Sequence, residues 1–176
     1  MTKYSLLLTL LLAFLENSNS SFISYSVNYA DRFHPYQDLM TQILNITSFY
    51  NLQATNIQTC VGSVLYCGIR TANQNFLTNF TSGPYEIVSL VGTISQGSQP
   101  HIHISLSDKY GNMVGGHLPS LEERQFYNQT DFSCPIYTTA EIILSENVNL
   151  VFQRPIDPQT TYDELQISYR NITFAS

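Results

Sequence analysis

The stretch from His101 to Ser107 constrains the fold more than any other part of the chain. Its side chains alternate, with histidine or serine at the odd positions and an aliphatic residue at each even position: Ile102, Ile104 and Leu106. A period of two indicates a β-strand with one buried face. We therefore expect His101 and His103 to project from the face opposite the aliphatic core.

A short polar turn then brings a third histidine back along the chain. Asp108 to Asn112 contains a glycine and has the length of a hairpin loop. If Asp108 and Asn112 close the loop, His103 lies opposite His117. Directly opposed residues of an antiparallel pair share a face, with Cβ atoms about 5 Å apart. A bulge at Gly115–Gly116 would shift this register by one residue.

Three converging imidazoles predict a metal site. Neutral nitrogen ligands suit zinc and its neighbours, and three protein ligands leave a coordination position open. The alternative is a set of polar residues on a solvated strand face. The cross-strand position of the third histidine favours the metal, so we expect a divalent ion, zinc in the first instance, at His101, His103 and His117.

Five motifs in order along the chain resemble those of the PPC (plants and prokaryotes conserved) domain: Tyr85–Leu90, Gly92–Ser95, His101–Asp108, Gly115–Leu118 and Tyr137–Ile142. The resemblance extends over nearly all of the chain after its first 24 residues. It implies an α/β (α+β) fold, with a mainly antiparallel sheet packed against one principal helix, assembled as a homotrimer. For stand-alone members it also implies a metal held at the three histidine positions. No single enzymatic activity follows from the family.

The first 20 residues have the pattern of a secretory signal peptide. A short basic start is followed by an apolar run from Leu6 to Leu15 and by small polar residues. A membrane-spanning helix needs about 20 apolar residues, so an uncleaved anchor is disfavoured, and no later segment is long and apolar enough to cross a bilayer. We expect a single PPC-like domain over residues 22–170, secreted or in the lumen of the secretory pathway.

Composition bears on partners and on modification. The net charge is −6, and the seven lysine and arginine residues form no cluster, which argues against nucleic acid as a partner. No AT-hook is present, so the DNA-binding role of the plant nuclear branch is not transferred. Asn-x-Ser/Thr sequons predict glycosylation in a secreted chain, with candidate sites at Asn45, Asn79, Asn128 and Asn171.

Before the histidine hairpin, the pattern predicts a strand over 25–33 and a helix over 36–50. Apolar residues of the helix fall in one arc, and Asn45 lies opposite them. Two β segments, 52–62 and 64–72, are expected to meet near Gly62. If Ser63-Val64 forms a two-residue hairpin loop, Cys60 and Cys67 are cross-strand neighbours and could form a disulfide. Alternatively, the three cysteines are buried thiols.

Glu141 is the candidate carboxylate for chemistry at the metal. It would act as a partner of a metal ligand or as general base for a metal-bound water, and the alternative is a hydrogen-bonded structural carboxylate. The polar segment 119–133 is predicted as a long surface loop, either a lid or partner contact or simply solvated.

Two function classes therefore remain open. The first is a trimeric binding or assembly module in which the metal fixes the sheet, with a small-molecule ligand possible at the open position. The second is a metal-dependent, hydrolase-like enzyme that activates water toward a small substrate. The absence of a substrate-reading motif favours the binding module.

Overall fold

The computed structural model describes residues 21–170. The predicted signal peptide, residues 1–20, and the sequon at Asn171 lie outside this range. Within it, no helix has the length and apolar composition needed to cross a membrane.

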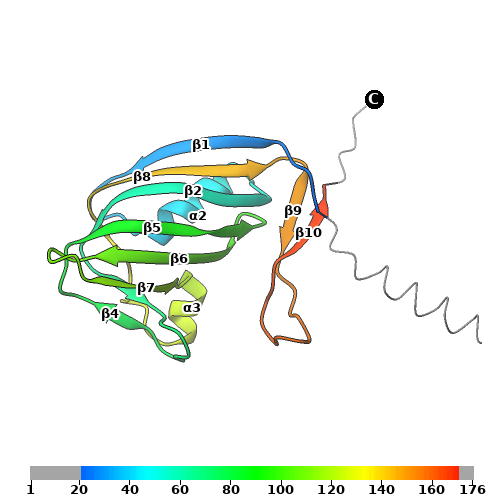
Figure 1. Cartoon of the computed structure of the whole chain (residues 1–176). Coiled ribbons are helices and arrows are strands. Elements are labelled where there is room, and N and C mark those ends of the chain that lie inside the picture. The colour runs from blue at the N-terminus through cyan, green and yellow to red at the C-terminus, as the bar shows by residue number, and fades with distance from the viewer. Residues whose placement is uncertain (1–20, 171–176) are drawn as a thin grey trace, which may run out of the picture.

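A six-stranded sheet forms the body of the protein (Figure 1). Every neighbouring pair is antiparallel. In spatial order the strands are β1 (Ser26–Phe33), β8 (Ile136–Asn147), β2 (Ala54–Val64), β5 (Tyr85–Ser95), β6 (Gln99–Ser107) and β7 (Met113–Leu118). One helix, α2 (Leu39–Phe49), covers one face of the sheet. The predicted fold, an antiparallel sheet packed with one principal helix, is confirmed.

Helix α2 begins where its N-cap is satisfied. The Asp38 side chain accepts a hydrogen bond from the Thr41 N–H at 3.0 Å, which satisfies one of the free donors of the first turn. Tyr36 has a φ of 68°, so the helix starts at Leu39, three residues after the predicted start. Of the predicted apolar arc, Leu39, Met40, Ile43 and Thr47 are buried and Ile46 is half-buried, whereas Tyr50 just after the helix is exposed. Asn45 is exposed, as predicted.

The core lies between α2 and the sheet. Ile102, Ile104 and Leu106 of β6 are at most 2% exposed, and they belong to one cluster with the buried residues of α2. Burial of an aliphatic side chain of this size contributes about 1.5–3 kcal/mol. The aliphatic half of the alternating pattern is therefore what fixes this strand, and it leaves His101 and His103 on the other face.

Two short strand pairs and one short helix complete the structure. Strand β3 (Cys67–Ile69) pairs with β4 (Thr78–Phe80), and β9 (Leu150–Gln153) pairs with β10 (Gln166–Tyr169). Helix α3 (Leu121–Phe126) lies within the segment predicted as a loop. A capping box starts it, because the Ser120 hydroxyl accepts from the Glu123 N–H and the Glu123 carboxylate accepts from the Ser120 N–H.

The predicted Cys60–Cys67 disulfide is wrong. The structure joins Cys67 to Cys134 and leaves Cys60 as a buried free thiol. The reason is that β2 continues to Val64 instead of turning at residues 63–64, and Cys60 pairs with Ile142 of β8. Strand β3 instead lies against the chain just before β8, where the Gly68 N–H donates to the Ser133 carbonyl at 3.1 Å.

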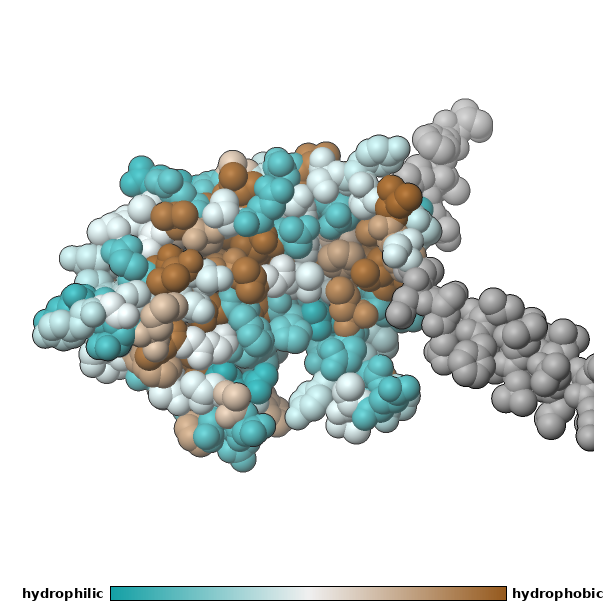
Figure 2. Space-filling view, viewed as in Figure 1, coloured by the Kyte–Doolittle hydropathy of each residue, from teal (hydrophilic) through white to brown (hydrophobic). Residues whose placement is uncertain are grey.

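The face of the six-stranded sheet opposite α2, which we call the open face, carries both polar and apolar side chains. Val61, Val88 and Val91 are each more than half exposed. In the space-filling view, brown apolar patches lie between hydrophilic ones over these strands (Figure 2). The open face is also the face from which the histidines project.

Candidate metal centre

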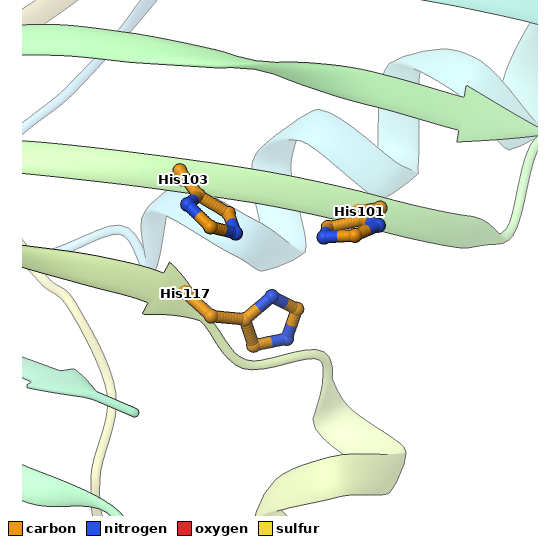
Figure 3. Close-up of side chains that lie close together, drawn as sticks. All are labelled: His101, His103 and His117. Atoms are coloured by element: carbon orange, nitrogen blue, oxygen red, sulfur yellow. The ribbon is translucent and has the colours of Figure 1, made fainter. Parts of the chain in front are cut away.

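The predicted meeting of three histidines is confirmed. Strands β6 and β7 pair without a bulge, and His103 lies directly opposite His117. The ring centroids are 5.4 Å apart for His101–His103 and for His101–His117, and 5.7 Å apart for His103–His117. One nitrogen from each ring lies within 4.8 Å of the others, and the three rings surround one space (Figure 3).

Strand β7 is held at this point by backbone on both sides. Besides pairing with β6, His117 exchanges two backbone hydrogen bonds with Arg70, each of 3.0 Å. This close approach needs a glycine at position 116, since a Cβ there would lie 2.6 Å from the Arg70 carbonyl oxygen. The segment after β3 therefore fixes the backbone of His117 against β6.

The His117 ring is oriented by a carboxylate from α3. Its Nε2 lies 2.8 and 3.0 Å from the two carboxylate oxygens of Glu123. A carboxylate accepts hydrogen bonds, so the proton of the neutral ring is on Nε2 and the lone pair is on Nδ1. Nδ1 is buried and has no hydrogen-bond partner among the described residues. A metal-binding histidine commonly has this carboxylate partner, so His117 fits a metal at Nδ1.

Burial and neighbouring charge favour neutral rings at the other two positions. Burial lowers the pKa of His101, and Arg154 and the other two histidines lower it further. The pKa of His103 is lowered by burial first, and then by His117 and Arg70. Neutral imidazole is the form that binds a metal, so at neutral pH His101 and His103 are in the form that a cation requires.

A cavity of about 680 Å³ adjoins the histidines and is large enough for a small ligand. His101 and His117 form part of its wall, together with Arg70, Arg154 and Tyr127. Four carboxylate residues also line it: Glu122, Glu123, Asp163 and Glu164. Glu122 and Glu123 belong to α3, and Arg70 to the segment after β3. Arg154, Asp163 and Glu164 belong to the connection between β9 and β10.

The structure does not bring Glu141 to this site. Glu141 is exposed on β8, and strands β2 and β5 separate β8 from β6, a distance of about 14 Å at the usual strand spacing. Glu123 instead has the role that the sequence suggested for Glu141, as the partner of a candidate metal ligand. The sequence contained a signal for Glu123, because Ser-x-x-Glu at 120–123 is a capping-box pattern.

The other residues named from the sequence are not part of the three-histidine group. Asn45 and Asn128 are exposed, whereas Asn79 is half-buried on β4; their glycosylation stays a prediction. Burial raises the pKa of Cys60 to about 12, so this thiol is not a thiolate ligand at neutral pH. His34 is exposed and precedes α2.

Fold and site together define an α+β protein with a three-histidine centre on the open face of an antiparallel sheet. Residues 24–125 match the Plants and Prokaryotes Conserved domain, abbreviated PCC or PPC. The chain belongs to this family.

Two curated relatives and several solved structures are similar to the chain. Bifunctional protein GlmU of Synechococcus sp. (strain JA-2-3B'a(2-13)) is 33% identical over 139 residues, which are 79% of this chain and 20% of that protein. The chain thus spans a fifth of the length of this relative. A hypothetical protein of Salmonella enterica has a solved structure that is 33% identical, with a TM-score of 0.75, covering 85% of this chain and 98% of that one.

Two more distant structures share the fold. One, from Archaeoglobus fulgidus and described as a metal-containing protein, is 24% identical with a TM-score of 0.63 and covers 84% of this chain and 99% of that one. The other, from Bacteroides thetaiotaomicron and described as a candidate DNA-binding protein, is 15% identical with a TM-score of 0.61 over 85% of this chain and 96% of that one.

Proposed function

We propose that this protein binds one divalent metal ion per chain, zinc in the first instance, through His101, His103 and His117. The observation that carries the proposal is the buried Nδ1 of His117, which has no partner among residues 21–170 while Glu123 holds the opposite nitrogen. Three imidazoles would leave a coordination position open to a ligand when the ion is bound. The metal-containing relative from Archaeoglobus fulgidus supports the same reading.

The function we propose is that of a trimeric binding module, with the metal fixing the sheet edge and presenting a small-molecule site. Three copies would cover the exposed valines of the open face. Hydrolysis at the metal, the second candidate, needs a free general base. Glu123 is already bonded to His117 and to the Ser120 N–H, and Glu141 is remote. Glu122, Asp163 and Glu164 line the adjoining cavity, but among the described residues none of their carboxylates is hydrogen-bonded to one of the three histidines, so the binding module is favoured.

We also propose that the protein enters the secretory pathway and carries glycans, and that it does not bind nucleic acid. The signal-like pattern of residues 1–20, the sequons and the net charge of −6 support this. Expression in a eukaryotic secretory host, followed by the intact mass of the product before and after deglycosylation, tests secretion and glycosylation. A product of unchanged full-length mass inside the cell would contradict them.

The metal proposal is tested by elemental analysis of the purified protein. His103→Ala should reduce bound zinc at least tenfold, because two imidazoles hold the ion much more weakly than three. His34→Ala, which removes the exposed histidine outside the site, is the matched control and should leave zinc unchanged. Zinc content that is equal in wild type and His103→Ala would end the assignment of these ligands.

A further inference from the structure

Two arginines lie next to the three histidines. The backbone of Arg70 pairs with His117, whereas the guanidinium of Arg154 lies 3.1 Å from Nδ1 of His101. Both arginines line the cavity that adjoins the histidines. Two arginine residues thus line one cavity next to the candidate metal position.

The contact between Arg154 and His101 is incompatible with a bound metal, whichever ring nitrogen holds the ion. Arginine can only donate, so the hydrogen bond requires a lone pair on Nδ1 and places the proton of the neutral ring on Nε2. An ion on Nδ1 would take that lone pair directly. An ion on Nε2 would move the proton to Nδ1, which would then face another donor. In either case Arg154 must release His101 when the metal binds.

The Arg154 side chain has two other hydrogen bonds. Its Nη2 donates to Thr93 Oγ1 at 2.9 Å, and its Nη1 donates to the Asp163 carbonyl at 3.1 Å. The bond to Thr93 keeps the group at the cavity wall after it leaves His101. Arg70 has no side-chain hydrogen bond or ion pair among the described residues and lies half-buried beside His117. Both guanidinium groups are therefore left with free donors.

We propose that the cavity binds a small oxyanion, a carboxylate or phosphate group, between Arg70 and Arg154, and that metal binding frees Arg154 for it. The proposal rests on the metal site proposed above. Guanidinium groups bind carboxylate and phosphate through paired, charge-assisted hydrogen bonds.

The other charges of the cavity restrict the size of this ligand. Glu123 is engaged by His117, but Glu122 and Asp163 are exposed and Glu164 is half-exposed, and all line the same cavity. Carboxylates repel a further anion, so an extended polyanion is disfavoured. A compact ligand with one anionic group, directed at the arginines, avoids this repulsion.

The test uses the full-length mature protein loaded with zinc and desalted. Isothermal titration calorimetry measures the binding of inorganic phosphate and, separately, of acetate, to wild type, Arg70→Gln and Arg154→Gln. Lys109→Gln is the control, because it removes one positive charge at the exposed β6–β7 turn. Circular dichroism and zinc content are measured on each variant. In the cobalt(II)-loaded protein, the visible spectrum reports whether the anion reaches the metal.

We expect wild type to bind at least one of the two anions, and each arginine variant to lose at least tenfold in affinity while folded and zinc-loaded. Lys109→Gln should match wild type, and Arg154→Gln should bind zinc at least as tightly as wild type because a competitor for His101 is gone. The anion that binds more tightly identifies the ligand class. Zinc-loaded protein that binds neither anion, or equal affinities in wild type and both arginine variants, would overturn this inference and leave the metal site standing. A wild type without zinc would instead overturn the metal site.

Discussion

At the scale of single residues, His117 links two parts of the site. Its backbone is held by β6 and by Arg70, and its ring is held by Glu123. Burial alone would raise the pKa of Glu123, but His117, the Ser120 N–H and Arg70 outweigh burial and lower it. The carboxylate therefore stays ionised at neutral pH and keeps the His117 proton on Nε2, away from the candidate metal position.

Replacing Glu123 by glutamine should weaken zinc binding about 10- to 100-fold, the usual cost of losing such a partner. The amide can donate as well as accept, so it no longer fixes the proton on Nε2. Competition with a zinc chelator of known affinity gives the value. Glu122→Gln, on the same helix but exposed, should bind zinc as wild type does, and a Glu123→Gln variant of wild-type zinc affinity would contradict the role assigned to Glu123.

At the scale of elements, Asp38 ties both helices to the sheet. It caps α2 through Thr41, accepts from the Cys134 N–H just before β8 at 2.8 Å, and pairs with Arg124 of α3 at 3.2 Å. Burial alone would raise the pKa of Asp38, but Arg124 and these hydrogen bonds outweigh it and hold the pKa below its ordinary value of 3.8. The pairing thus also anchors the helix that carries Glu123.

Because the pKa of Asp38 is lower in the folded state than in the unfolded chain, its ionised form stabilises the fold above about pH 4. That contribution is lost as the pH falls through the folded-state pKa. Asp38→Asn should therefore cost about 1–2 kcal/mol at pH 7, with a smaller difference from wild type in acid. Urea unfolding at pH 7 and below pH 4 measures both values.

Asp131→Asn is the control, since Asp131 is exposed in the segment between α3 and β8. It should change stability by less than about 0.5 kcal/mol. A difference between Asp38→Asn and wild type that stays constant or grows as the pH falls would contradict the ionised role of Asp38.

At the scale of elements, the sequence predicted the features that depend on residues close together in the chain. The alternation of 101–107 and the length of the turn at 108–112 determine which residues face each other, and the structure has that register. The disulfide depends on contacts between distant segments: Cys67 and Cys134 are 67 residues apart, and neither periodicity nor turn length brings them together. Helix α3 was missed because its six residues are too few to show a helical period.

At the scale of the whole molecule, the open face sets the histidines beside an apolar surface. Val91 lies opposite His103 on the neighbouring strand. Val61 and Ile143 line a hollow of the same face with Arg32 and Glu141. Exposed valines on a sheet are costly in a monomer because apolar surface in water is unfavourable. The proposed trimer would cover this surface and would place Glu141 at a subunit boundary.

Val61→Glu should convert the proposed trimer into monomers. Burying a valine contributes about 1.5–3 kcal/mol per chain, whereas burying an unpaired carboxylate at the same place is strongly unfavourable. Native mass spectrometry and light scattering give the mass. Phe49→Glu, which alters a residue of α2 that is 81% exposed on the other side of the sheet, is the control and should remain trimeric. A monomeric wild type, or a trimeric Val61→Glu, would contradict assembly through the open face. Zinc retained by monomeric Val61→Glu would show that one chain supplies all the ligands, as the three histidines of β6 and β7 predict.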